Sequence, residues 1–304
     1  MTFVDHGPVR GIVTSVKELS PTFRRITFSG PELNALAAQG PFYDQRIKII
    51  LPNVSDQLPE IPQGPQGYQA WVALPDDQRG MMRTYSIRDM TRVEHVTSLS
   101  IDFVLHCAED GSTGPASAWA AAAKPGDELL LVAPRVGAEA VGIEFCPGGA
   151  EQIVLLGDEA AAPAIGRILE DLDAVGHTAE VSAYIEVPTA ADQLAIDTAA
   201  QVNWLPRDDA PLGQPLVEAL GWHVQDDPVE PSSADELLWE TPVFSASGET
   251  LATTTAPDTG MYYWIAGESG VIKRLRRFLV NEIGVDRSQV AFMGYWRHGV
   301  AMRG

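Results

Sequence analysis

The chain has 304 residues, of which 45% are hydrophobic and 20% are charged, so it is long enough for two domains with ordinary globular cores. The 21 Lys and Arg are outnumbered by 41 Asp and Glu, which gives a formal net charge of −20. This charge argues against binding to nucleic acid or to an anionic membrane surface, and it mildly disfavours an acidic protein partner.

Cysteine and histidine usage indicates no metal site. Cys107 and Cys146 form no CxxC pattern, and the six His residues show no clustered ligand spacing. Two thiols in a chain of this length fit a reducing compartment. Residues 1–6 lack the basic and then apolar run of a signal peptide, and no segment reaches the ~18 uninterrupted apolar residues of a membrane span. We therefore predict a soluble cytoplasmic protein.

The N-terminal half predicts an antiparallel β-barrel. Residues 9–28 alternate like two paired strands, with a turn at Ser20-Pro21 and a short helix beginning near Pro31. A strand over 45–52 is followed by a Pro-, Gly- and Gln-rich segment, 53–80, which predicts a loop. Strands around residues 83–86, over 99–105 and over 128–133 complete the pattern of short strands and short turns.

The stretch Arg83-Thr84-Tyr85-Ser86 carries the first chemical signal. Strand alternation puts Arg83 and Tyr85 on one face, and Thr84 and Ser86 on the other. An Arg can grip a phosphate with two donors, a Tyr offers a flat apolar ring, and a Ser hydroxyl can donate or accept. Together they suit a ligand with a diphosphate and a ring that changes protonation, such as a flavin. Taken alone, the pattern is a weak signal, and an ordinary edge strand explains it better.

A second element follows about 30 residues later. The strand Asp102-Phe103-Val104-Leu105-His106 leads into a Gly-rich turn, which ends in Gly114-Pro115-Ala116-Ser117 and opens a short helix of small residues. The start of a helix presents unpaired backbone N–H groups, which form a ready anion site. Ser117 is placed to cap that helix or to touch a phosphate.

The C-terminal half predicts a parallel α/β domain. Residues 137–150 form a linker, after which the apolar strand 152–156, a helix to about Val175 and the strand 180–187 form a βαβ unit. Further strands are expected over 201–206, 261–266 and 289–295, with a helix opening at Gly267-Glu268-Ser269-Gly270. We predict domains of residues 1–148 and 149–304. An acidic insertion over 208–258 is expected to be a lid or a solvated loop.

Four motifs together resemble the siderophore-interacting protein family, within the ferredoxin-reductase-like superfamily. They are Asp102–His106, Gly114-Pro115-Ala116-Ser117 with Trp119, Gly157-Asp158-Glu159 followed by Pro163-Ala164, and residues 294–299. The resemblance spans essentially the whole chain in the expected order. It implies an FAD-binding barrel, an α/β domain like those that bind NAD(P)H, and a ferric-siderophore reductase that releases Fe(II) in the cytoplasm.

The resemblance also implies the roles of individual residues. Tyr85 and Ser86 lie at the flavin ring as the catalytic residues, and Ser86 hydrogen-bonds its reactive nitrogen. Arg83, His106 and the turn 114–117 hold the diphosphate, Asp158 and Glu159 lie over the adenine, and Trp296 lies beside the isoalloxazine. The full predicted cofactor-binding set is Arg83, Thr84, Tyr85, Ser86, Asp102, Phe103, Val104, His106, Gly114, Pro115, Ala116, Ser117, Asp158, Glu159 and Trp296.

Three cations are predicted to bind the substrate. Lys48 and Arg135 match basic positions of the family that face the substrate opening, and Lys273 is the nearest candidate for a third. Each is otherwise read as a solvated surface charge, the usual fate of Lys and Arg. A ferric siderophore is often anionic, and on a protein of net charge −20 it needs a local basic pocket.

The electron donor is left open by the sequence. The wider superfamily binds the nicotinamide dinucleotide at a Gly-rich turn, but here Asp158 and Glu159 occupy it and would repel a diphosphate. Ala160 also stands where the family usually has Thr. NADH, NADPH and a ferredoxin therefore all stay candidates. The alternatives are a flavin- or ferredoxin-type reductase with another acceptor, and a non-catalytic siderophore or flavin carrier. A dinucleotide-fold dehydrogenase is disfavoured, because no GxGxxG follows a strand.

Overall fold

The alternating apolar residues near the start of the chain form the first hairpin of an antiparallel sheet, as predicted. In the computed structural model, β1 (Val9–Glu18) pairs with β2 (Phe23–Ser29). The structure describes residues 7–64, 66–106, 113–138, 141–221, 238–241, 244–245 and 260–299. The chain divides into two units, the first ending at Ile143 and the second beginning at Glu144. Each unit is described by itself.

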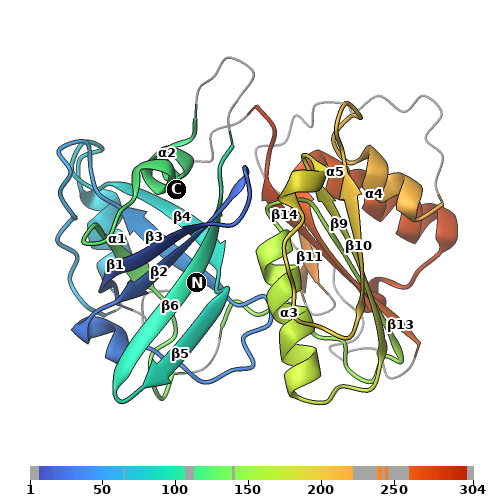
Figure 1. Cartoon of the computed structure of the whole chain (residues 1–304), viewed down its shortest axis with the longest axis horizontal. Coiled ribbons are helices and arrows are strands. Elements are labelled where there is room, and N and C mark those ends of the chain that lie inside the picture. Colours follow the sequence, from blue (N-terminus) through green and yellow to red (C-terminus); the bar gives the residue numbers. More distant parts are fainter. Residues whose placement is uncertain are drawn as a thin grey trace. The chain divides into compact units, whose positions relative to one another are not determined.

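The sheet of the first unit has seven strands in the order β4-β3-β7-β1-β2-β6-β5, and every pairing is antiparallel. Its remaining strands are β3 (Arg46–Leu51), β4 (Met81–Ser86), β5 (Asp89–Val93), β6 (Val96–Val104) and β7 (Glu128–Val132). The sheet curls around a core of aliphatic and aromatic side chains, so the predicted antiparallel barrel is confirmed as a half-barrel (Figure 1).

Short helices cover the ends and the outside of this sheet. The predicted helix at Pro31 is a 3₁₀ turn, η1 (Pro31–Ala35), and α2 (Pro115–Ala122) begins with Pro115 at a position where proline is tolerated. The prediction of an unbroken loop over 53–80 is wrong, because α1 (Gly67–Ala73) lies within it. Trp71 explains this helix, since its ring is buried beside Ile50 and Met82 of the sheet.

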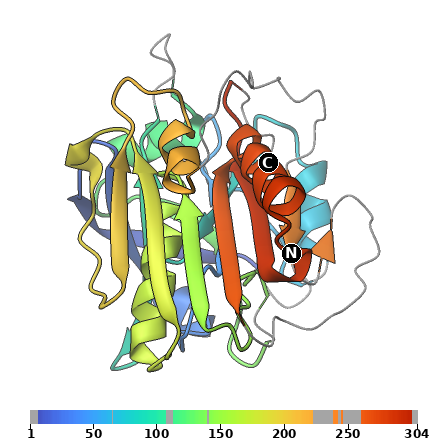
Figure 2. The same cartoon turned by 90° about the vertical axis from the view of Figure 1, so that its right-hand side faces the viewer.

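The second unit has a mixed sheet in the order β10-β9-β8-β13-β14-β11-β12 (Figure 2). The strands β8 (Gln152–Gly157), β9 (Glu180–Val187), β10 (Gln201–Pro206), β13 (Met261–Glu268) and β14 (Val290–Trp296) are parallel, as predicted. Helix α3 (Ala162–Ala174) lies on one face, and α4 (Gln214–Ala219) and α5 (Ser269–Arg276) lie on the other (Figures 1 and 2).

The ends of two helices follow from local sequence. Helix α3 ends where the sequence predicted, because Gly176 adopts a φ of +67° and donates to the Asp173 carbonyl at 3.1 Å, while His177 donates to the Leu172 carbonyl at 2.9 Å. These two bonds form a Schellman motif. The helix that begins with α5 passes into π-helical turns over Arg277–Ile283, and Phe278 and Leu279 stay on its buried face.

The acidic segment 208–258 is partly built into the fold. Helix α4 lies at its start, and β11 (Trp239–Thr241) and β12 (Phe244–Ser245) extend the sheet antiparallel beyond β14, where the sequence predicted a lid or a loop. Glu240 of β11 forms ion pairs with Arg276 at 2.6 Å and with Arg287 at 3.0 Å. Residues 222–237, 242–243 and 246–258 lie outside the described residues. Among the helices that are described, none combines the length and apolar character needed to cross a bilayer.

Candidate functional site

The register of β4 against β3 decides which way the Arg83–Ser86 side chains point. Arg83 stands opposite Ile49 and Tyr85 opposite Ile47, both buried in the core of the half-barrel. Thr84 and Ser86 stand opposite Lys48 and Arg46 on the other face. The predicted alternation is confirmed. It also means that Tyr85 and Ser86 leave β4 on opposite faces, with Ser86 at the last position of the strand.

Arg83 is a half-buried cation. Its Nη1 donates to the Met82 carbonyl at 2.7 Å, and burial lowers the pKa of its guanidinium, opposed in part by Tyr85. Among the described residues no carboxylate pairs with Arg83, whereas Arg10, Arg24 and Arg25 of the same sheet are all paired. A guanidinium that has lost water and lacks an anionic partner is suited to binding an anion.

Tyr85 is fixed by an aromatic cluster. Its ring lies 4.6 Å from that of Phe103 on β6, and Phe103 lies 5.8 Å from Trp119 of α2. Burial raises the pKa of the Tyr85 hydroxyl above its ordinary value, so the group stays protonated at neutral pH. The structure thus brings together Tyr85 and Phe103, two predicted site residues that the sequence separates by 18 positions.

Asp102 is engaged by arginines. Its carboxylate is fully buried and accepts from Arg25 Nε at 2.6 Å and Arg25 Nη2 at 2.8 Å, a bidentate pair, while Arg88 Nε lies 3.6 Å away. Neither arginine was among the predicted site residues. The register could have indicated one of them, because Arg25 stands directly opposite Asp102 on the neighbouring strand.

The start of α2 is joined to the end of β6 through Ser117. The Ser117 hydroxyl donates to the Val104 carbonyl at 2.9 Å and accepts from the His106 backbone N–H at 3.0 Å. It therefore anchors the helix start to the strand end and makes no cap on its own helix. Gly114 stands at the N-cap with Pro115 at the next position. The preceding turn, residues 107–112, including Cys107, lies outside the described residues.

The two predicted substrate cations of the first unit have different hydrogen-bond partners. Lys48 donates to Thr84 Oγ1 at 2.6 Å, and burial, with Arg46 nearby, lowers the pKa of its ammonium. Arg135 Nη2 donates to the Gly7 carbonyl at 3.1 Å and to Gln63 Oε1 at 2.6 Å. Neither cation has a carboxylate partner within the described part of the chain.

In the second unit, Asp158 is buried at the end of β8. Its Oδ2 accepts from the Glu268 backbone N–H at 2.7 Å and from the Trp296 indole N–H at 2.8 Å, and its Oδ1 accepts from the Ala160 N–H at 2.9 Å. Burial, with the Glu159 carboxylate beside it, raises the pKa of Asp158 from 3.8 to about 8, although the three hydrogen bonds oppose that shift. The structure brings together two predicted site residues, Asp158 and Trp296.

Glu159 points to a different partner, Arg207. The Arg207 guanidinium lies 3.3 Å from Glu159 and 2.8 Å from the fully buried Glu186, and burial raises the pKa of Glu186. Burial opposes the charge on Arg207, but the two carboxylates outweigh it and raise the pKa of that guanidinium. Sequence reasoning missed Arg207 and Glu186. Both lie at the carboxyl ends of parallel strands, the edge where this type of sheet binds ligands.

Glu268 was also missed as a functional residue, although its place at the start of α5 was predicted. Its Oε2 accepts from the N–H groups of Gly270 and Val271 at 2.7 and 2.9 Å, and its Oε1 accepts from the His298 N–H at 3.2 Å. Lys273, the third predicted substrate cation, lies in the last turn of α5.

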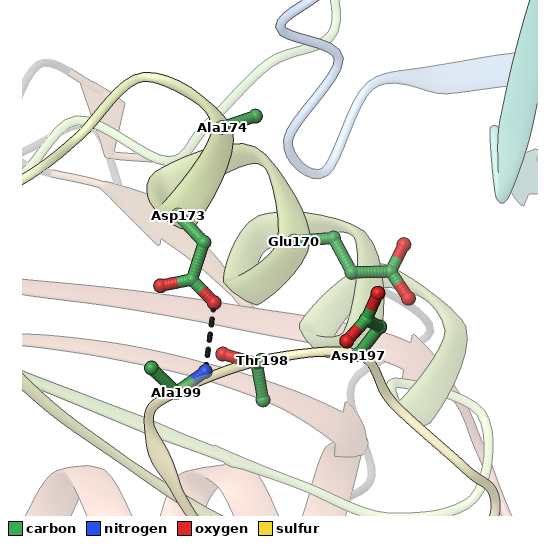
Figure 3. A pocket seen from close by; sticks show the side chains of 6 residues that line it. All are labelled: Glu170, Asp173, Ala174, Asp197, Thr198 and Ala199. Atoms are coloured by element: carbon green, nitrogen blue, oxygen red, sulfur yellow. Dashed lines mark hydrogen bonds between the residues drawn. The ribbon is translucent and has the colours of Figure 1, made fainter.

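A hollow of about 730 Å³ lies elsewhere, beside the C-terminal half of α3 (Figure 3). Asp173 there accepts from the Ala199 N–H at 2.9 Å, and hydrogen bonds from Thr198 and Ala199 lower its pKa. The hollow is lined by Glu170, Asp173, Ala174, Asp197, Thr198 and Ala199. It contains none of the predicted site residues, and its three carboxylates disfavour an anionic ligand.

Comparisons with known proteins identify relatives for both units. The model of the siderophore-interacting FAD-binding domain matches residues 12–138, and that of the siderophore-interacting protein matches residues 150–299. The NADPH-dependent ferric-chelate reductase of Escherichia coli (strain K12) is 28% identical over 288 residues, which cover 93% of this chain and 91% of that protein. Ferric vibriobactin reductase ViuB of Vibrio cholerae is 26% identical over 285 residues, covering 93% and 87%.

Solved structures agree with these relatives. A siderophore utilization protein from T. fusca superposes with a TM-score of 0.66 at 26% identity, over 97% of this chain and 95% of that one. The similarity therefore extends through both units.

Proposed function

This chain belongs to the siderophore-interacting protein family, and on that premise we propose that it is an FAD-dependent ferric-siderophore reductase. The names of its relatives in Escherichia coli and Vibrio cholerae, a ferric-chelate reductase and a ferric vibriobactin reductase, support this activity. We assign FAD binding to the domain of residues 1–148, and the donor side to residues 149–304.

The observation that carries the proposal is the state of Arg83. A half-buried guanidinium without a carboxylate partner among the described residues fits a phosphate, and FAD brings a diphosphate. Beside it, the Tyr85 ring is held against Phe103 and offers an apolar contact for a planar ring. Ser86, at the end of the same strand, adds a hydroxyl that can donate or accept. The donor set present therefore fits FAD.

When bound, FAD supplies the redox chemistry that links a two-electron donor to a one-electron acceptor. The protein contributes binding and orientation. Arg83, with His106 and the turn 114–117, holds the diphosphate, and Tyr85 and Ser86 orient the ring. Because the Tyr85 hydroxyl keeps its proton, it serves as a neutral hydrogen-bond donor.

The substrate is the ferric siderophore. We propose that Lys48, Arg135 and Lys273 attract this anionic complex to a protein whose net charge is −20. Reduction to Fe(II) weakens a complex built from hard oxygen ligands, and so releases the iron, in our proposal into the cytoplasm.

We propose a nicotinamide dinucleotide as the electron donor, on the precedent of the relative named as NADPH-dependent. Asp158 and Glu159 do not exclude it, since protein groups engage both carboxylates: the indole of Trp296 and two backbone N–H groups for Asp158, and Arg207 for Glu159. A ferredoxin is the alternative donor, and the experiment below separates the two.

The test is an anaerobic titration of the FAD-supplemented protein with NADH and with NADPH, followed by flavin absorbance. We expect bleaching by one of them, and recovery of absorbance when a ferric siderophore is added. A bound flavin that recovers only with another acceptor contradicts the siderophore as substrate. A flavin that stays oxidised with both dinucleotides contradicts the proposed donor and indicates a protein donor or a carrier. A protein that holds no flavin overturns the whole proposal.

Two sets of variants separate cofactor binding from substrate binding. Arg83→Ala should lose flavin, whereas Arg10→Ala, in an exposed ion pair of the same sheet, should keep it. Lys48→Ala and Arg135→Ala should weaken siderophore reduction while FAD stays bound, and exposed Lys17→Ala serves as their control. Loss of flavin in the Lys48 or Arg135 variant would show that these residues bind the cofactor and that their assignment to the substrate is wrong.

A further inference from the structure

Asp158 joins the ends of three neighbouring parallel strands. It follows β8, and through one oxygen, Oδ2, it accepts from the backbone N–H of Glu268, at the end of β13, and from the indole N–H of Trp296, at the end of β14. Asp158 is only 3% exposed, so these bonds form away from water. Buried hydrogen bonds to a carboxyl group are stronger than those at the surface.

The backbone around Glu268 is arranged for this contact. A bulge between Gly267 and Glu268 shifts the register, so that Gly267 pairs with Gly294 but Glu268 pairs with Trp296. Gly267 has a φ of +150°, and a Cβ there would lie 2.6 Å from Asp158 Oδ2. Only glycine allows the chain to pass so close to the carboxyl group.

A second carboxylate holds the same segment. Glu268 caps α5 through Oε2, and its Oε1 accepts from the backbone N–H of His298 at 3.2 Å. The end of β14 and the residues after it are therefore anchored twice, by the Trp296 side chain and by the His298 backbone. Neither anchor involves Arg207, which pairs with the neighbouring Glu159, or Glu186.

The polar atom of the Trp296 indole is satisfied inside the protein. The side chain is half-buried, and its only polar atom, Nε1, donates inward to Asp158. The rest of the indole is an apolar ring, whose centroid lies 6.4 Å from that of the His298 ring in an edge-on arrangement. A ring whose orientation is set by a buried hydrogen bond is preorganised for contact with a planar group.

We propose that Asp158 is a positioning residue, which fixes the Trp296 indole through its N–H so that the ring meets a planar part of the bound ligands in one orientation. This role rests on the proposed function, and it differs from the direct contact with FAD that the sequence predicted for Asp158. The carboxyl group has three protein donors, and it acts through Trp296.

The test follows the Trp296 indole N–H by NMR in the flavin-free protein. Its resonance is identified by its absence in Trp296→Phe, and its hydrogen-exchange rate is measured in the wild type and in variants. Asp158→Ala removes the acceptor, and exchange should accelerate about tenfold or more. Asp158→Asn keeps one acceptor oxygen and should stay within about threefold of the wild type. Glu186→Gln, another buried carboxyl group of this sheet, should leave the indole rate unchanged.

Turnover provides the second measurement. The kcat per flavin-loaded molecule should fall about tenfold in Asp158→Ala and in Trp296→Phe, because a displaced ring costs orientation. Asp158→Asn should restore most of it. The double variant should be no slower than Trp296→Phe alone, whereas multiplied losses would show that Asp158 acts independently of the indole and would overturn the proposal.

Failure of this proposal is distinguishable from failure of the proposed function. If the wild-type indole N–H exchanges as fast as an exposed one, or if Asp158→Ala leaves its rate unchanged, the positioning role is wrong even when the protein reduces ferric siderophores. The wild-type measurement decides this point when Asp158→Ala does not fold. If the protein binds no flavin but the exchange rates behave as expected, Asp158 holds Trp296 and the proposed function is wrong.

Discussion

The buried ion pair between Asp102 and Arg25 offers a sharp test of how the first domain is stabilised. The Asp102 side chain is 0% exposed, and the side chains of Arg25 and Arg88 are 29% and 8% exposed. Replacing Asp102 with Ala removes the carboxylate shared by Arg25 of β2 and Arg88, which lies between β4 and β5. Arg25 can recover some water at the domain surface, but Arg88 cannot.

The expected cost follows from this burial. Removing one partner of a buried pair typically costs about 3–5 kcal/mol, and the exposure of Arg25 places Asp102→Ala near the lower end. The matched control is Glu128→Ala, which breaks the pair with Arg10 on the same sheet at a distance of 3.0 Å. The side chains of that pair are 50% and 34% exposed, so its loss should cost less than about 1 kcal/mol.

Urea unfolding followed by far-UV circular dichroism measures both variants. Equal losses of unfolding free energy in the two would refute the argument from burial. The same variant tests the predicted contact of Asp102 with FAD. Unchanged flavin affinity in the folded Asp102→Ala protein assigns the residue to the ion pairs alone, whereas weakened affinity supports a contact with the cofactor.

Three further predictions concern single side chains. Ser117→Ala loses the two hydrogen bonds that join the start of α2 to the Val104 carbonyl and the His106 N–H. It should lower the free energy of unfolding by urea by about 1–3 kcal/mol, and an unchanged midpoint would contradict this. Gly267→Ala forces a Cβ to within 2.6 Å of Asp158 and should lower Tm more than Gly284→Ala, which meets no atom within 4 Å. In the folded protein the pKa of Asp158 is about 8, above its ordinary value of 3.8. The stability that this group contributes is therefore lost as pH rises from about 4 through 8. If the unfolding free energy of Asp158→Asn changes with pH as steeply as that of the wild type, the shift is refuted.

Local pattern was enough to predict most of the secondary structure. Alternation of apolar residues places strand side chains on two faces, so the first hairpin and the faces of Arg83 and Tyr85 could be predicted without a structure. A continuous apolar strand followed by a helix indicates a parallel sheet, and a glycine free to adopt positive φ marks the end of α3. These features depend on residues that are close together in the sequence, so they can be predicted from the sequence alone.

Partners far apart in the chain were decided by the tertiary structure alone. Asp158 meets the Glu268 backbone across 110 positions and the Trp296 indole across 138, and Asp102 meets Arg25 across 77. Helix α1 formed against expectation because Trp71 finds a buried site on the sheet. In each case the sequence shows a polar group that needs a hydrogen-bond or charge partner, or an apolar ring that needs a buried site. Which group meets that need depends on strand order and register, because burial and hydrogen bonding act between atoms close in space, whatever their separation along the chain.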